Sequence, residues 1–357
     1  MKDPRRTNKG NIRHDFLDII FLVISAVICG ASNWEEIEFF GKSQIKWLKK
    51  HGSYKNGIPS HDTVNRVISS IEPKQFSSCF TSWINEISVL SDKEVVAIDG
   101  KSIRNSYDKA SGKSAVHMVS AFASKNGLCL GQVSTKEKSN EITAIPELLE
   151  NIAIKGSIVS IDAMGCQTKI ADKIIEKKAD YILAVKGNQG NLEQGIKDTV
   201  RFNKPFESHT ETDFGHGRIE KRTCNLYELS EHIEEPERWQ KLNMLIEIQS
   251  ERIIKSTGDV NHQTRYYISS LKNNAATVNH AVRSHWSVEN NLHWVLDVTF
   301  GEDASRKRQK FAAENFNTIS KIALTLLANE KSVKASKKHK RLVAALNIEF
   351  REKVLKI

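Results

Sequence analysis

The stretch Glu94–Ser106 reads EVVAIDGKSIRNS, in which four apolar residues run directly into an aspartate, a glycine and a lysine. An uninterrupted apolar run such as Val95–Ile98 is typical of a strand that is buried on both faces of a sheet. A carboxylate at the end of a buried strand loses hydration, which costs free energy unless a positive charge meets it. Two explanations are therefore open: Asp99 pairs with Lys101 at a surface turn, or Asp99 holds a metal ion or a catalytic proton.

The residues that follow alternate between strand and helix patterns. The segments 115–123 and 128–135 are separated by Ser-Lys-Asn-Gly, which predicts a β-hairpin. Antiparallel strands followed by parallel strands with crossover helices are the order of a ribonuclease-H-like core, a mixed α/β fold. In such a sheet, functional groups gather beyond the carboxyl ends of the strands. The further expected elements are helices at 142–152 and 168–179 and strands at 157–161 and 181–185.

Three other regions flank or interrupt this core. Helical patterns dominate residues 1–90, where we expect an all-helical, DNA-binding N-terminal domain that precedes a catalytic core at 91–330. Strand-like runs and turn signals predict a β-rich insertion at 202–271, and a long helix is expected at about 275–297. The lysine-rich residues 331–357 are expected to form a basic, solvated tail close to DNA.

One helix of the N-terminal region is a candidate for reading DNA. Pro59 and Ser60 form a typical helix start, with Ser60 as the N-cap. The helix that follows carries His61, Asn65 and Arg66, and a short turn precedes it. This arrangement fits either a helix-turn-helix in which Arg66 contacts DNA or an ordinary helical hairpin.

The composition favours a cytoplasmic protein that binds a polyanion. The formal net charge is +10 and the isoelectric point is about 9.2, so nucleic acid is the first partner to consider, beside a merely basic solvated surface. Five separated cysteines without a CxxC pair argue against a disulfide framework and suit a reducing compartment. The most apolar run, at 19–29, is too short to span a membrane and reads as a core helix.

A second carboxylate shares the context of Asp99. Asp162 directly follows the apolar run SIVSI, another predicted strand of the same sheet. In the ribonuclease-H-like order the first and fourth strands are neighbours, so the two carboxylates are expected to lie close together. Two such anions repel each other unless cations bind between them, and Mg²⁺ or Mn²⁺ suits a site of oxygen ligands.

A third carboxylate is expected from the late helix, whose sequence includes RSHWSVENNLHWVLD. His285, Glu289, His293 and Asp297 recur every four residues and line one face of that helix. Glu289 is the best-placed third ligand. The two histidines are eight residues apart, too far to share one ion easily, so capping or DNA contact is the expected role of both. Weaker candidates for the third ligand are Asp297, Glu302 and Asp303.

Six ordered motifs resemble the insertion-sequence DDE transposases, specifically the H-repeat-associated branch. They are AIDGKS, SIDAMGCQ, AVKGNQ, GHGRIE, YYISSL and HWSVENNLHWVLDVTFGED, and the segments 3–40 and 57–68 resemble the helical region that precedes the catalytic core in that branch. The resemblance implies Asp99, Asp162 and Glu289 as an acidic triad with the β-rich insertion between the second and third residues. It also implies that two Mg²⁺ or Mn²⁺ ions serve the cutting and joining of double-stranded DNA at terminal inverted repeats, by a homodimer in the DNA complex.

The sequence departs from this wider superfamily around the glutamate. A tyrosine, an arginine and a lysine are expected at offsets that hold Val282, His285 and Leu296 here. His285 is expected to bind phosphate in place of the arginine, and the lysine is either supplied by Lys186 or absent. A catalytically inactive DNA-binding remnant, or a ribonuclease-H-like nuclease without strand transfer, is therefore an alternative. The expected DNA contacts are Lys101, Lys186, Arg218, His285 and Arg66.

Overall fold

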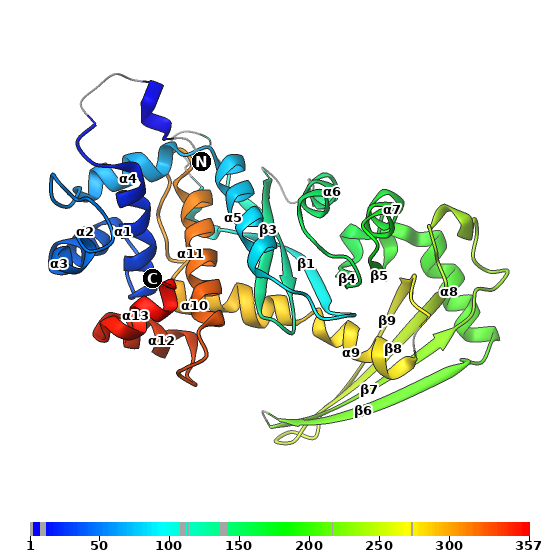
Figure 1. The fold of residues 1–357 in the computed structure, drawn as a ribbon. Helices are drawn as coiled ribbons and strands as arrows, with labels where there is room; N and C mark the ends of the chain where they lie inside the picture. The colour runs from blue at the N-terminus through cyan, green and yellow to red at the C-terminus, as the bar shows by residue number, and fades with distance from the viewer. Residues whose placement is uncertain are drawn as a thin grey trace.

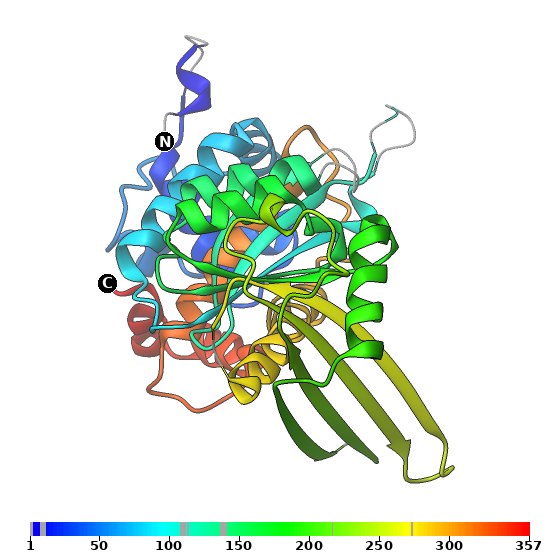
Figure 2. The ribbon, with the colours of Figure 1, turned by 90° about the vertical axis from the view of Figure 1, so that its right-hand side faces the viewer.

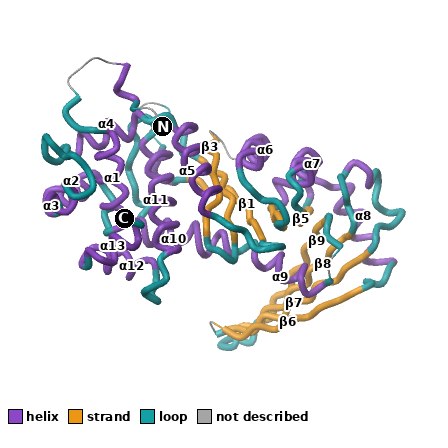
Figure 3. The backbone as a smooth tube through the Cα atoms, viewed as in Figure 1, coloured by secondary structure: helices purple, strands orange, loops and turns teal. Residues whose placement is uncertain are grey.

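The computed structural model describes residues 3–7, 12–107, 112, 114–135, 141–215, 217–272 and 274–357. Within these residues, a mixed sheet of nine strands has the order β3-β2-β1-β4-β5-β9-β8-β7-β6. The N-terminal and C-terminal helices gather at one side of the core strands, and a long β extension lies at the other (Figures 1 and 3).

The first five strands have the predicted ribonuclease-H-like arrangement. The strand β1 pairs antiparallel with β2 and parallel with β4, and β5 continues the parallel part. The mixed α/β fold class is confirmed, and so is the neighbourhood of the first and fourth strands, because Ile98 lies opposite Ile161. The strands are β1 (Val95–Ser102), β2 (His117–Ala123), β3 (Leu128–Thr135), β4 (Ile158–Ile161) and β5 (Asp180–Val185).

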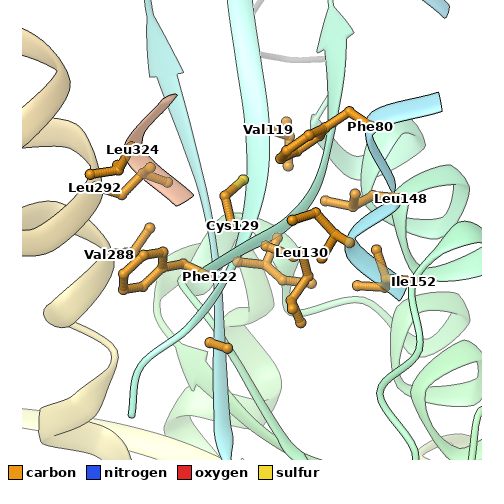
Figure 4. Packing of buried hydrophobic residues seen from close by; sticks show 14 of the residues in the cluster. Phe80, Val119, Phe122, Cys129, Leu130, Leu148, Ile152, Val288, Leu292 and Leu324 are labelled. Atoms are coloured by element: carbon orange, nitrogen blue, oxygen red, sulfur yellow. The ribbon is translucent and has the colours of Figure 1, made fainter. Parts of the chain in front are cut away.

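Helices cover both faces of this part of the sheet. A first layer of helices packs on one face of the sheet, and a second layer of helices packs on the other face (Figure 2). Phe80, Leu148 and Ile152 lie on one side of the strands, and Leu292 and Leu324 on the other (Figure 4). The first layer comprises α5 (Pro73–Ile87), α6 (Glu141–Asn151) and α7 (Thr168–Glu176), and the second comprises α9 (Ala275–Ser284), α10 (Trp294–Phe300) and α11 (Ala312–Asn329).

The predicted β-rich insertion extends the same sheet. Its last strand, β9, pairs antiparallel with β5, so that Leu183 lies opposite Ile268. The helix α8 (Gly190–Phe202) leads into the insertion, whose strands project beyond the core (Figure 1). The strands are β6 (Glu207–Gly215), β7 (Arg218–Tyr227), β8 (Met244–Ile254) and β9 (Val260–Ser269). Short 3₁₀ turns lie at Pro4–Thr7, Arg104–Ser106, Ala163–Gly165, Gly187–Gln189 and Pro236–Arg238.

The N-terminal helices pack against α11 rather than standing apart. Asp15, Asn33 and Ser60 cap three of them through their side chains, as the predicted helix starts require. Their buried side chains belong to the same hydrophobic cluster as those of the sheet, so the boundary at residue 90 stays a prediction. No helix in the described ranges has both the length and the apolarity needed to cross a membrane. The helices are α1 (Phe16–Ile28), α2 (Trp34–Ser43), α3 (Ile45–Leu48) and α4 (His61–Ser70).

The C-terminal residues form α12 (Lys337–Leu346) and α13 (Ile348–Leu355), and the prediction of a fully solvated tail is wrong. The side chains of Lys340, Arg341 and Arg351 are buried. The Arg341 guanidinium donates to the carbonyls of Val27, 2.8 Å away, and Ala31, 3.2 Å away, and also to that of Thr299. A cation here donates to carbonyls at or just beyond the ends of α1 and α10, which is why a basic residue is buried.

Replacement of Arg341 should therefore loosen the attachment of α12. We expect Arg341→Ala to lower the free energy of unfolding by about 2–4 kcal/mol, because several buried carbonyls lose their donor. The matched control is Lys338→Ala on the same helix, whose exposed side chain should contribute less than about 0.5 kcal/mol. Urea unfolding followed by circular dichroism measures both, and equal effects of the two substitutions would contradict this role of Arg341.

Candidate active site

Two aspartates meet where the parallel pairing of β1 with β4 ends. Asp99 follows Ile98, and Asp162 follows Ile161, its partner across the ladder. The strand β1 continues beyond Asp99 because it stays paired with β2, whose Ser120 lies opposite Asp99. Asp162 instead caps a 3₁₀ turn, and its Oδ1 accepts from the Met164 nitrogen at 3.0 Å. The backbone therefore fixes both carboxylates at one edge of the parallel strands.

The predicted helix at 275–297 is interrupted where it reaches these aspartates. The helix α9 ends before His285, and a π-helical turn at Glu289–His293 precedes α10. A π turn changes the direction in which side chains leave a helix and often occurs at functional sites. Here it brings Glu289 to Asp99, and ligand atoms of Asp99, Glu289 and His293 all lie within 4.8 Å of one another.

His293 is the member of this group that the sequence prediction missed. Its Nδ1 lies 3.0 Å from Glu289 Oε2 and 3.5 Å from Asp99 Oδ2. The side chain is almost completely buried, and its expected role, capping or DNA contact, stays a prediction. Helical spacing relates His293 to His285, two turns away, whereas its neighbours in the structure are Glu289, one turn away, and Asp99 on β1. The four-residue spacing of Glu289 and His293 is the sequence signal that could have indicated this contact.

The three predicted carboxylates line one cavity of about 680 Å³. Asp99 and Asp162 come from the strand ends, and Glu289 from the π turn. Strand β9 of the insertion forms another wall, so the insertion helps to build the site. Polar or aromatic residues that also line the cavity include Ser160, Lys186, Lys197, Arg265, Tyr266, His285 and Trp286.

The electrostatics of the cavity favour a cation. Burial, together with the negative charges of Asp162, Glu141 and Glu289, raises the pKa of Asp99 to about 7, against a lowering by the Gly100 backbone. The fold therefore holds Asp99 where ionisation is costly without a nearby positive charge. Carboxylate oxygens are the ligands that Mg²⁺ and Mn²⁺ prefer, so the donor set fits a hard divalent ion.

Gly100 is required by a buried pair behind the strand. His117 Nε2 lies 2.5 Å from Glu141 Oε1, and His117 Nδ1 lies 2.9 Å from Ser102 Oγ. A Cβ at position 100 would lie only 2.3 Å from Glu141 Oε1. The glycine after Asp99 therefore admits the His117–Glu141 pair, a contact between distant segments that sequence spacing could not reveal.

Lys101 does not pair with Asp99, which excludes the surface-turn explanation. Its ammonium contacts Asp297 and lies 3.1 Å from Glu302 Oε2, and only 15% of its side chain is exposed. Side chains two residues apart on a strand share a face, so Lys101 points toward α10 as Asp99 does. Two carboxylates occupy its ammonium, and Lys101 as a DNA contact stays a prediction. The same contacts engage Asp297 and Glu302, two of the weaker candidates for the third ligand.

The other predicted DNA contacts are dispersed. Lys186 is exposed and lines the cavity. His285 also lines it, and burial lowers its pKa despite opposing effects of Asp162 and the Ser160 backbone, so it faces the cavity as a neutral ring. Arg218 begins β7, outside the cavity lining, and its Nε lies 3.8 Å from Glu220. Arg66 is exposed on α4, far along the chain from these residues.

Comparison with known proteins agrees with this geometry. The family described as "Transposase DDE domain" matches residues 90–326, and the DDE_Tnp_1-associated family matches residues 1–84. This chain belongs to the DDE transposase family. The predicted resemblance to H-repeat-associated transposases is confirmed.

Two relatives of this DDE transposase align over nearly its whole length. The "Putative transposase YncI" of Escherichia coli O157:H7 is 45% identical over 99% of this chain and 92% of its own. The "H repeat-associated putative transposase YhhI" of Escherichia coli K12 is 42% identical over 99% of this chain and 95% of its own. Among solved structures, the piggyBac transposase in a synaptic complex with hairpin DNA has a TM-score of 0.46 and 11% identity, over 99% of this chain and 76% of that one.

The raised pKa of Asp99 predicts that this transposase gains stability when the carboxylate is removed. The folded-state pKa of about 7 exceeds the ordinary value of 3.8, so folding disfavours the ionised form, and stability falls as pH rises between these values. Without divalent ions at pH 8, Asp99→Asn should increase the free energy of unfolding by about 1–3 kcal/mol, and by much less at pH 4.5.

Urea titrations in EDTA at both pH values measure this difference. Asp172→Asn, which removes an exposed carboxylate from α7, is the control and should change stability by less than about 0.5 kcal/mol. Added Mg²⁺ should stabilise the unsubstituted protein more than Asp99→Asn. A variant that is less stable than the unsubstituted protein at pH 8 would contradict the electrostatic description of the site.

Proposed function

We propose that this DDE transposase cuts and joins DNA at the terminal inverted repeats of its insertion sequence, with Asp99, Asp162 and Glu289 as its acidic triad. The observation that carries the proposal is the convergence of these carboxylates, from three separate elements, on one cavity. The raised pKa of Asp99 supports a site made for cations, since carboxylates without a partner would be costly there.

The triad would hold two divalent ions, Mg²⁺ or Mn²⁺. When bound, such ions supply the Lewis acidity that in-line phosphoryl transfer needs at the attacking and the leaving oxygen. Asp99, whose pKa is raised by burial and by both Asp162 and Glu289, would be the shared ligand. Asp162 keeps one oxygen on the backbone of the 3₁₀ turn, which fixes the direction of the other. The protein's own contribution is to orient ligands and substrate in advance.

Cationic and aromatic side chains around the triad suit a DNA strand. Lys186 and Lys197 line the cavity beside the acids, and the exposed Trp286 carries the Arg265 guanidinium 5.3 Å from its ring centroid. Lysine and arginine would contact phosphates, and an aromatic ring offers a stacking surface. Lys186 would take the place of the lysine that is missing after Glu289, while the neutral His285 would donate a hydrogen bond rather than a charge.

An end-cleavage assay with Mg²⁺ tests the proposal. The unsubstituted protein should cut DNA that carries the element's own terminal repeats and join the ends to a target. Asp99→Asn, Asp162→Asn and Glu289→Gln should each abolish cleavage while gel-shift binding stays intact, with a steep salt dependence.

The control for this assay is Glu211→Gln, which removes an exposed carboxylate from the edge strand β6. It should leave cleavage unchanged. Cleavage without joining would favour a nuclease that lacks strand transfer, and binding without cleavage would favour an inactive remnant. Full cleavage by any of the three triad variants would contradict the assignment of that residue.

The N-terminal helices at 1–90 would recognise the repeats. In α4, His61 is held by Glu38 at 2.7 Å and the Asn65 side chain accepts from Ser69, whereas Arg66 is exposed to solvent. If α4 reads DNA, Arg66→Ala should lower the preference for repeat over random DNA by roughly ten- to a hundredfold, the value of one good base contact.

Fluorescence anisotropy on repeat and random duplexes measures this preference, with Arg238→Ala, which removes an exposed arginine within the insertion, as the control. An unchanged preference in Arg66→Ala, together with reduced cleavage, would indicate instead that these helices serve packing or pairing with a second subunit in a homodimer.

A further inference from the structure

His293 is buried beside the acidic cluster. Its Nδ1 faces both Glu289, at 3.0 Å, and Asp99, at 3.5 Å. Its Nε2 is buried and lacks a hydrogen-bond partner within the described part of the chain. Two lysines lie nearby: the Lys101 ammonium is 3.5 Å from the His293 carbonyl oxygen, and Lys321 donates to Ser120, the residue opposite Asp99 in the sheet.

Two roles are compatible with the position of Nδ1. A metal-binding Nδ1 must be unprotonated, which puts the proton of a neutral ring on Nε2. A histidine that binds a metal almost always donates that second N–H to an acceptor, and no acceptor is within reach of Nε2 among the described residues. A ring that carries its proton on Nδ1 has the opposite pattern: it donates to the Glu289 carboxylate and leaves only a lone pair on the buried Nε2.

The contacts of the ring favour the second pattern. A proton on Nδ1 is shared with the Glu289 carboxylate, 3.0 Å away, and lies close to that of Asp99, 3.5 Å away. A proton on Nε2 would be a buried donor without an acceptor among the described residues, which costs free energy.

We propose that His293 is a positioning residue that donates from Nδ1 to Glu289 beside Asp99 and holds the two carboxylates together for a divalent ion, without binding the ion itself. The inference rests on the proposed metal site. It leaves that site with oxygen ligands only, which suits Mg²⁺ and Mn²⁺, whereas an imidazole ligand would shift the preference toward Zn²⁺. The π turn is what allows one ring nitrogen to reach both carboxylates.

Pulsed electron paramagnetic resonance of the unsubstituted protein with Mn²⁺ tests this directly. A coordinated imidazole couples its ¹⁴N nucleus strongly to the ion, and the coupling changes when histidine is labelled with ¹⁵N. We expect Mn²⁺ to bind without such a coupling. A histidine-dependent coupling would overturn the inference and leave the proposed metal site intact, whereas absence of any Mn²⁺ binding would contradict both.

Mn²⁺ affinity of His293 variants gives a second readout. His293→Ala should weaken binding by about tenfold, as expected for loss of a residue that orients a ligand. His293→Asn keeps an N–H donor near the position of Nδ1 and should recover most of the affinity, whereas His293→Gln, whose amide lies near Nε2, should not. His262→Ala removes an exposed imidazole from β9 and is the control. Unchanged affinity in a folded His293→Ala would also overturn the inference.

Discussion

The site depends on the parallel pairing of β1 with β4, in which Ile98 and Ile161 lie opposite each other and each is followed by an aspartate. Main-chain hydrogen bonds and buried apolar side chains hold this ladder, so the two carboxylates cannot move apart when they repel. Repulsion and burial together raise the pKa of Asp99 to about 7. The free energy that ionised Asp99 costs is offset by the hydrophobic core, and a bound cation would lower it. Such a cost is common where the needs of a functional site oppose stability.

Several interactions between distant segments keep the third carboxylate against that ladder. Lys101 extends from β1 to Asp297 of α10 and to Glu302, whose other oxygen accepts from Asn317 of α11 at 2.5 Å. Arg341 joins the ends of α1 and α10 from the C-terminal helix. The N-terminal and C-terminal helices therefore stabilise the element that carries Glu289, whatever DNA they also contact.

Sequence patterns predicted the core of the fold because apolar runs, hairpin turns and helix caps are local signals. The strand order then followed from the order of elements, and with it the meeting of Asp99 and Asp162. What local signals could not predict are contacts made across the fold: the burial of His293 beside Asp99, the His117–Glu141 pair behind Gly100, and the use of Lys101 inside the protein. The interruption of the predicted helix at His285 could not be predicted either, because the helical periodicity of the sequence continues through this residue.

The proposed function requires that Asp99, Asp162 and Glu289 form one site for divalent ions at the end of the β1–β4 ladder. Anomalous diffraction from crystals soaked in Mn²⁺ tests for this site, because it locates the ion without depending on activity or on DNA. We expect anomalous density within bonding distance of carboxylate oxygens of all three residues, about 2.0–2.6 Å for hard cations of this kind. Density that lies elsewhere, with these three carboxylates left without an ion at saturating Mn²⁺, would contradict it.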